Sequence, residues 1–409
     1  MSQRFWGRNV TLSDYVELNP RVNLLRGANV PFVSMDIISP GTRKVYPVQE
    51  RPASGSGSKF GPGDTLFARI TPCLENGKIA QYAGDRAGMG STEFFVLRAR
   101  DDISDPAFVY YFSQNPDLRS AAEKSMSGAS GRQRAVISSL SEFECEFPPL
   151  AIQKRIAGIL SAYDELIENS QRRIKILEAM ARGLYREWFV HFHFPGHENH
   201  PRAASTAGEI PKGWEVKKLG DISSYINRGI TPTYDDEGDS IVINQKCVRD
   251  QRLNLEPSRK QSKAVSNEKR VCFGDVLINS TGVGTLGRVA QVYENLKNYT
   301  VDTHVTIARA KRDIDLDFYG CCLLSLQETF ERMGVGATGQ TELGRAAISD
   351  IDLAIPPIIL QQQFGKSVHG IRSAAETYAK KIQNLRRTRD LLLPRLLSGQ
   401  INVEAAEHV

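Results

Sequence analysis

The chain has 409 residues, 41% of them apolar and 24% charged, which is ordinary for a soluble globular protein and allows two or three domains. It contains no run of 18 apolar residues and its N-terminus lacks a secretion signal, so we expect a cytoplasmic protein that is neither membrane-spanning nor secreted. The six cysteines include no Cys-x-x-Cys pair, which argues against a disulfide framework and favours buried, reduced thiols.

Residues 1–146 predict a first globular domain of mixed α/β type. Short strand-like runs such as TLFARI, GKIAQY and STEFFVLRA alternate with turns rich in Gly, Pro, Ser and Asp. One helix is predicted over 105–124, because Asp105 can cap its first turn and Pro106 can occupy the first helical position.

A long helix is predicted over 147–194. Its apolar residues recur with alternating gaps of four and three, which is the 3.5-residue period of a coiled coil. Pro148 and Pro149 mark its start, because proline is tolerated in a first helical turn but not beyond it. The apolar seam consists of Ile156, Leu160, Tyr163, Ile167, Ile174, Leu177 and Leu184.

Residues 195–213 are rich in Pro, Gly, Ala and Ser without periodicity, and we interpret them as an interdomain linker. Four histidines, His191, His193, His197 and His200, fall close together here, a spacing that could suit zinc. No cysteine or carboxylate cluster supports them apart from Glu198, so we favour aromatic packing and a solvated linker and predict no metal site.

A second globular domain is predicted over 214–354, because the pattern of the first domain returns there. The run GDVLINSTGVGTLGRVAQV at 274 aligns with GDTLFARITPCLENGKIAQY at 63, and DTHVTIARA at 302 aligns with STEFFVLRA at 91. A repeat of about 200 residues indicates a duplicated domain, since the units of solenoid proteins are far shorter.

A second long helix is predicted over 355–400, followed by a tail at 401–409. Its seam lies 208 residues after the first and consists of Phe364, Val368, Ile371, Ile382, Leu385 and Leu392. Arg389 interrupts this seam, and Pro394 is expected to end or kink the helix. Duplicated helices can pair across a pseudo-two-fold axis. We therefore predict an α+β fold in which two mixed α/β domains, related by internal duplication, are separated by two long antiparallel coiled-coil helices.

Motifs for catalysis are missing from the sequence. The run GVGTLG at 282–287 fits the dinucleotide pattern GxGxxG, but a strand-like segment follows it rather than a helix, so we interpret it as a tight turn. There is no Walker loop, no Asn-Pro-Pro-aromatic tetrapeptide of amino-methyltransferases and no grouping typical of nucleases or triad enzymes. The sequence thus predicts a chain without chemistry or a cofactor of its own.

Basic residues gather in two segments and suggest contact with nucleic acid. Residues 246–270 hold eight Lys or Arg against three acids, and 361–400 hold eight against two. For the second segment a solvated helix face is an equally good interpretation. Polar and basic residues in or near corresponding turns of the two domains are candidates for reading bases. They are Arg69, Ser130, Arg132, Gln133 and Arg134 in the first domain, and Arg249, Arg252, Asn279, Ser280, Thr281, Thr338, Gln340 and Thr341 in the second.

Four segments together resemble the specificity (S) subunit of type I restriction-modification enzymes. FPPLAIQKRI opens the first long helix and LYREWFVHFHFPG closes it, IPKGWEVKKLGDI opens the second domain, and IPPIILQQQF opens the second helix. The resemblance implies that each globular domain is a target-recognition domain for one half of a bipartite sequence in double-stranded DNA. It also implies that the helices form an antiparallel coiled coil that spaces the two domains.

The resemblance further implies partners rather than catalysis by this chain. Two modification (M) subunits would bring S-adenosylmethionine and methylate adenine, and restriction (R) subunits would bring ATP, Mg²⁺ and DNA cleavage. Two alternatives remain open. A stand-alone methyltransferase predicts that the purified chain binds S-adenosylmethionine, whereas a regulatory coiled-coil protein that binds other proteins predicts no salt-dependent affinity for DNA.

Overall fold

The computed structural model describes residues 9–53, 55–128, 131–206, 208–335 and 341–403. The chain divides into two compact units, the first formed by residues 1–171 with 380–409 and the second by 172–379. Both long helices contribute one part to each unit. Within the described ranges no helix is both long and apolar enough to cross a membrane.

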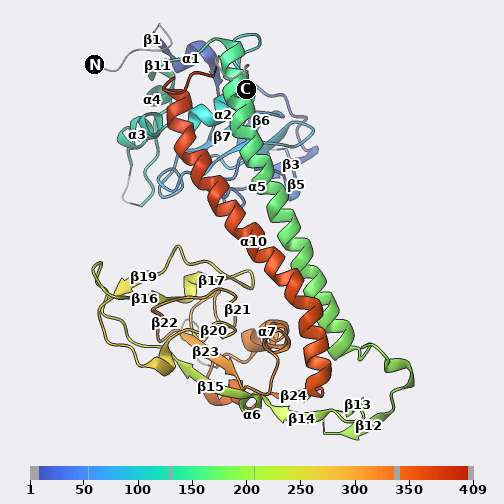
Figure 1. The fold of residues 1–409 in the computed structure, drawn as a ribbon. Coiled ribbons are helices and arrows are strands. Elements are labelled where there is room, and N and C mark those ends of the chain that lie inside the picture. The colour runs from blue at the N-terminus through green and yellow to red at the C-terminus, as the bar shows by residue number, and fades with distance from the viewer. Residues whose placement is uncertain (1–8, 54, 129–130, 207, 336–340, 404–409) are drawn as a thin grey trace. The chain divides into compact units, whose positions relative to one another are not determined.

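Unit 1 has a larger and a smaller sheet, and some of their strands are labelled in Figure 1. The larger has the order β2-β10-β7-β8-β4, with β2 (Val16–Leu18), β10 (Phe94–Ala99), β7 (Thr65–Ala68), β8 (Ile79–Tyr82) and β4 (Lys44–Val45). The smaller has the order β5-β3-β9-β6, with β5 (Gln49–Pro52), β3 (Asn29–Val33), β9 (Gly88–Gly90) and β6 (Ser58–Phe60). A ribbon pairs β1 (Asn9–Thr11) with β11 (Glu144–Glu146).

The larger sheet of unit 1 is covered on both faces. Phe67 and Phe95 pack into one apolar cluster, whereas the adjacent Leu66 and Val96 pack into another, because successive side chains of a strand point to opposite faces. The helices of this unit are α1 (Leu12–Tyr15), α2 (Pro106–Ser113), α3 (Pro116–Lys124) and α4 (Ser138–Ser141), besides part of each long helix.

The helix predicted over 105–124 is two helices in the structure. Asp105 caps α2 as expected, its side chain accepting a hydrogen bond from the Phe108 amide at 2.9 Å. The chain then breaks at Asn115, whose side chain caps α3. The reason is Pro116, which lacks an amide hydrogen and disfavours helical geometry at the residue before it.

Unit 2 repeats this plan. Its larger sheet has the order β15-β23-β20-β21, with β15 (Ser223–Arg228), β23 (Val305–Ala310), β20 (Val276–Asn279) and β21 (Val289–Gln291). Its smaller sheet has the order β19-β16-β22, with β19 (Arg259–Gln261), β16 (Ser240–Ile243) and β22 (Tyr299–Val301). Ribbons pair β17 (Val248–Arg249) with β18 (Arg252–Leu253), and β14 (Glu215–Lys218) with β24 (Asp352–Ile355). The helices are α6 (Leu219–Ile222), α7 (Leu316–Ser325), α8 (Gln327–Arg332) and α9 (Arg345–Ser349).

The segment 195–213, interpreted above as a linker, is partly ordered into a hairpin of β12 (Arg202–Ser205) and β13 (Gly208–Pro211). Ile210 from this hairpin is buried in the same apolar cluster as Trp214 and Phe194. The segment is therefore packed against unit 2 rather than free of it.

Two sets of hydrogen bonds recur in both units. Arg98 pairs with Asp64 at 2.6 Å, and Arg309 pairs with Asp275 at 2.7 Å, each joining neighbouring strands of the larger sheet. Gln153 and Gln361, near the start of the two long helices, make the other set. The Gln153 side chain donates to the Pro148 carbonyl and accepts from the Asp105 amide, and that of Gln361 does the same with Pro356 and Asp315. The internal duplication predicted from the sequence is thus confirmed at the level of individual contacts.

The two long helices are α5 (Leu150–Tyr185), which continues as a π-helical turn at Arg186–Val190, and α10 (Ile358–Leu397). In unit 1 the N-terminal part of α5 shares an apolar cluster with the C-terminal residues Leu396 and Leu397. In unit 2 the C-terminal part of α5 clusters with Phe364 and Val368 from the start of α10. The helices therefore pair in an antiparallel sense. Every predicted seam residue is buried or half-buried, and Pro394 lies inside the last turns of α10, which ends at Leu397.

Arg389, which interrupts the second seam, forms a buried polar bridge in unit 1. Its guanidinium is paired with Asp164 of α5 and donates to the Gly41 carbonyl at 3.0 Å. The Tyr111 hydroxyl of α2 donates to the other oxygen of Asp164. Only 9% of the Arg389 side chain and 11% of the Asp164 side chain are exposed. Burial disfavours the charged guanidinium, but the carboxylates of Asp164 and Asp390 together outweigh burial and raise the pKa of Arg389. The residue thus ties α10, α5 and the first domain together.

Candidate nucleic-acid interface

Three segments of unit 1 meet at one end of its larger sheet and form what we call the first strand-end cluster, Arg69, Glu93 and Arg134. Arg69 directly follows β7, and Glu93 directly precedes the antiparallel neighbour β10. Residue 134 joins them through a bridge with Ile70 and through the hydrogen bond from the Ala135 amide to the Arg69 carbonyl, 2.7 Å long.

Glu93 organises the charges of this cluster. It accepts hydrogen bonds from Arg134 at 2.7 and 2.9 Å and lies 3.5 Å from the Arg69 Nε atom. The hydrogen bonds from Arg134 hold the pKa of Glu93 below its usual range. Two arginines therefore share one carboxylate, and 44% of the Arg134 side chain remains exposed. An arginine held in this way can present its fork to a guanine edge or to a phosphate.

Two other predicted readers of unit 1, Arg132 and Gln133, lie beside this cluster. Arg132 is exposed and Gln133 is half-buried, and the Gln133 carbonyl accepts a hydrogen bond from the Thr71 amide at 3.0 Å. Ser130 lies outside the described residues.

Unit 2 has a second strand-end cluster at the corresponding place, formed by Arg228, Thr281, His304 and Glu342. Thr281 follows β20 closely, and His304 directly precedes the antiparallel neighbour β23. The Thr281 hydroxyl is hydrogen-bonded to the His304 Nδ1 atom at 2.6 Å, and residue 281 is bridged to Glu342. Arg228, the last residue of β15, pairs with Glu342 at 2.7 Å.

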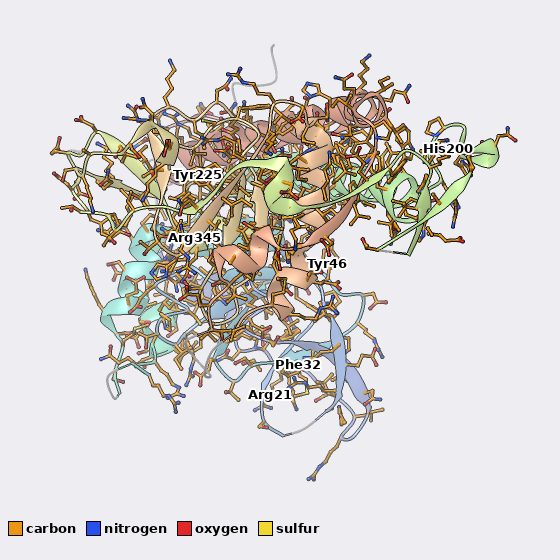
Figure 2. All side chains as sticks on the ribbon, turned by 90° about the horizontal axis from the view of Figure 1, so that it is seen from below. Arg21, Phe32, Tyr46, His200, Tyr225 and Arg345 are labelled. Atoms are coloured by element: carbon orange, nitrogen blue, oxygen red, sulfur yellow. The ribbon has the colours of Figure 1, made fainter. Side chains whose placement is uncertain are left out.

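Neighbouring residues hold this second cluster in place. The buried Asp302 accepts a hydrogen bond from the His304 amide at 2.9 Å, and burial raises the pKa of Asp302. Arg345 of α9 donates to Asn227 and lies near Tyr225 on β15 (Figure 2). The two clusters thus occupy equivalent positions but present different side chains.

Two predicted readers of unit 2, Asn279 and Ser280, are corrected by the structure. Both are fully buried, because the strand runs through Asn279 before the chain turns. The Asn279 side chain donates to the Gln245 carbonyl at 3.0 Å, and the Ser280 hydroxyl is bonded to that of Thr306. Both side chains lie in the interior of unit 2 and have no exposed surface that could contact a duplex.

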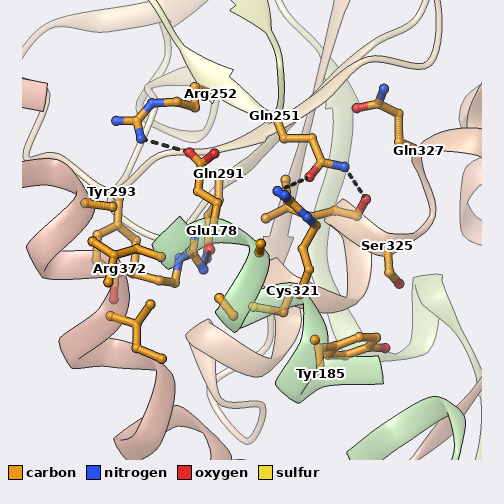
Figure 3. Close-up of a pocket in the computed structure, with 18 of the residues that line it drawn as sticks. Glu178, Tyr185, Gln251, Arg252, Gln291, Tyr293, Cys321, Ser325, Gln327 and Arg372 are labelled. Atoms are coloured by element: carbon orange, nitrogen blue, oxygen red, sulfur yellow. Dashed lines mark hydrogen bonds and ion pairs between the residues drawn. The ribbon is translucent and has the colours of Figure 1, made fainter. Parts of the chain in front are cut away.

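Arg252 is likewise corrected, because its guanidinium is held by the two long helices. It pairs with Glu178 of α5 at 2.9 Å and with Glu376 of α10 at 3.1 Å, at a cavity of about 780 Å³ within unit 2 (Figure 3). The adjacent Gln251 side chain donates to the Leu324 carbonyl at 3.0 Å. Arg252 therefore fastens the β17–β18 hairpin to the helices. Arg249, at the other side of the hairpin turn, is exposed.

The glycine-rich run at 282–287 is a turn, as the sequence analysis expected. Gly282, Gly284 and Gly287 all have positive φ angles, and β21 follows. Gly282 has a φ angle of +107°, which residues with a side chain rarely adopt, so glycine is favoured there. Of the predicted readers that follow, Thr341 is half-buried, whereas Thr338 and Gln340 fall in a stretch that the structure does not describe.

The histidines at 191–200 make local contacts. His193 is hydrogen-bonded to Glu187 at 3.0 Å, His197 to the Phe194 carbonyl at 2.9 Å, and His200 to the Lys212 carbonyl at 2.8 Å. Across the described ranges, no group of three or more His, Cys, Asp and Glu side chains is arranged to hold a metal ion.

Sequence reasoning missed Glu93, Arg228, His304 and Glu342. Glu93 and His304 occupy the same place in the two aligned runs STEFFVLRA and DTHVTIARA, and their difference in charge was the available signal. Arg228 and Glu342 carry no such signal, because strand pairing alone brings these two distant residues together.

Comparison with known proteins gives one consistent family. A family model described as the Type I restriction modification DNA specificity domain matches residues 73–179 and 211–387. The type I restriction enzyme MjaIX specificity subunit of Methanocaldococcus jannaschii is 29% identical, over 73% of this chain and 69% of the relative. The HindI specificity subunit of Haemophilus influenzae is 23% identical, over 83% of this chain and 86% of the relative. A crystal structure of the type I restriction-modification S subunit from M. genitalium shares the fold, with a TM-score of 0.54 and 18% identity over 95% of each chain.

Proposed function

This chain belongs to the type I restriction-modification DNA specificity family, and from that premise we propose that each strand-end cluster reads one half of a bipartite DNA target. The observation that carries the proposal is the pair of clusters itself. The two units share their framework contacts, yet the residues at matching strand ends differ in type and charge. A shared scaffold with different side chains at one place is expected of two domains that bind different versions of one ligand.

In this proposal residues 1–146 and 214–354 are the target-recognition domains, and α5 and α10 are the spacer helices between them. The chain performs no chemistry. Two M subunits carry S-adenosylmethionine and methylate adenine, and R subunits carry ATP and Mg²⁺ for cleavage, all in the cytoplasm. The observed contacts that support a role for the helices as a fixed frame are those of Arg389 and Arg252, each of which joins a domain to both helices.

Exchange of one domain tests the proposal. We expect that replacing residues 1–146 with those of a relative changes one half of the methylated motif and leaves the other half intact. The donor domain should provide the contacts that Gly41, Arg43 and Tyr111 make with the helices, because their loss would disturb the frame as well as the reader. The motif is measured by sequencing modified bases in cells that also contain the M subunits.

The matched control replaces residues 214–354, and there the other half of the motif should change. If either exchange altered both halves of the motif, the two domains would not read independently and the proposal would fail.

A further inference from the structure

Each unit stacks an arginine on an aromatic ring at the same edge of its smaller sheet. In unit 1 the guanidinium carbon of Arg51, on the outermost strand β5, lies 3.9 Å from the ring centre of Phe32, which Figure 2 labels on β3. In unit 2 the guanidinium carbon of Arg259, on the outermost strand β19, lies 3.9 Å from the ring centre of Tyr234. Both arginines are exposed.

The two pairs are built from residues that do not correspond in the duplication. Arg51 lies opposite Val30 in the sheet, whereas Arg259 lies opposite Val242, which is the counterpart of Phe32. The stacked arrangement is therefore more than a remnant of the common framework. The two units thus have a stacked arginine at the same edge of the smaller sheet, but they form it from different positions of the duplicated fold.

Among the described residues neither guanidinium has an ion-pair partner, although the Asp36 carboxylate is close enough to Arg51 to interact with it electrostatically. The adjacent Glu50 is paired with Arg86. Stacking on a ring restricts the arginine side chain and leaves the in-plane N–H groups available. Such a preorganised fork, without an ion-pair partner of its own, matches the oxygens of a phosphate.

In unit 1 the stacked pair lies close to the strand-end cluster. Phe32 and Arg51 line a cavity of about 640 Å³ together with Ser91 and Thr92, and Thr92 directly precedes Glu93. The stacked pair of Arg51 and Phe32 and the first strand-end cluster are thus neighbours on the surface of one domain.

In unit 2 two lysines bind the segment that links Arg228 of the second strand-end cluster to Tyr234 of the stacked pair. The Lys269 ammonium donates to the Gly229 carbonyl at 3.1 Å, next to Arg228 of the second strand-end cluster. The Lys263 ammonium donates to the Thr231 carbonyl at 3.2 Å, three residues before Tyr234. Both lysines bind neutral carbonyls and keep their charge for another partner. Four acidic residues at 235–239 follow Tyr234, so Arg259 has to be tested separately from Arg51.

We infer that Arg51 and Arg259 hold backbone phosphates of the DNA on which the strand-end clusters read bases, so that each positions its domain without contributing to sequence choice. The inference rests on the proposed function and adds to it the residues that fix each domain on the duplex. Contacts to phosphate carry no sequence information, whereas contacts to base edges do.

The test measures affinity against salt concentration for the complex assembled with M subunits, on a duplex that holds its motif and on a scrambled duplex. We expect Arg51→Gln and Arg259→Gln each to reduce the slope of log K against log salt by about 0.9, and the double variant by about twice that amount. Both duplexes should lose affinity alike, and the methylated motif should stay the same. Tyr234→Leu keeps the charge of Arg259, so it should weaken binding without changing the slope.

Arg100→Gln and Arg312→Gln are the matched controls. These exposed arginines follow the C-terminal ends of β10 and β23, whereas the strand-end clusters lie at the N-terminal ends of the same strands. Slopes for Arg51→Gln and Arg259→Gln that equal those of the controls would overturn the inference while leaving the proposed function standing. A changed motif would also overturn it, since the residue would then read bases. If the unaltered complex bound DNA without salt dependence, the proposed function itself would fail.

Discussion

Arg389→Ala should destabilise unit 1 by about 3 to 5 kcal/mol, which is the usual cost of removing one partner from a buried ion pair. The substitution leaves the Asp164 carboxylate, 11% exposed, with the Tyr111 hydroxyl as its remaining partner from the bridge. It also removes the donor to the Gly41 carbonyl, which is one of the contacts between the first domain and α10. Denaturant unfolding of the purified chain measures the loss.

Two further variants make this result specific to the bridge. Arg387→Ala, on an exposed residue of the same helix, should change the free energy of unfolding by no more than about 0.5 kcal/mol. The double variant Asp164→Leu with Arg389→Met should recover most of the loss, because well-packed apolar side chains often replace a buried ion pair without cost. If the double variant were as unstable as Arg389→Ala, the ion pair would not be the cause.

Arg134→Ala should relax the first half of the DNA target. The substitution removes the exposed arginine that Glu93 holds in position, and one good base contact contributes about 1 to 3 kcal/mol of discrimination. We therefore expect affinity for the target to fall roughly 5- to 150-fold, which is that free energy converted at 1.4 kcal/mol per factor of ten. One position of the first half should become degenerate when modified bases are sequenced, and the second half should not change.

Arg100→Ala provides the control, because Arg100 follows the far end of β10 whereas Glu93 precedes its start. The motif should be unaffected by it. Should Arg134→Ala weaken all sequences equally and leave the motif intact, then Arg134 binds phosphate, and the first strand-end cluster is not a base reader.

The architecture could be predicted from the sequence because it rests on repetition. The apolar seam has a fixed period, and the copies of Gln153 and of the Asp64–Arg98 pair lie at nearly constant offsets. The same reasoning treated Arg389 as an interruption. A seam pattern counts apolar residues, so it could not show that Asp164 and Gly41 lie opposite this arginine.

The interface was harder to predict, because it is assembled by strand pairing. The sequence located turns that contribute to the two strand-end clusters, but it could not tell the last buried residues of a strand from the first exposed ones. Asn279 and Ser280 are buried, and Thr281 is the residue that reaches the surface cluster. Likewise Arg252 belongs to a basic segment, yet two carboxylates on the helices hold it. The distribution of charge along the chain does not reveal which lysines and arginines are already paired with carboxylates.

In the proposed function, one chain carries two independent DNA readers at matching places of a duplicated fold. The most direct measurement is the sequencing of modified bases in a host that contains this chain together with intact M subunits. Two independent readers should produce a methylated-adenine motif with two short defined halves and an unspecified gap between them. A continuous motif, or no motif at all while the M subunits are active, would contradict it.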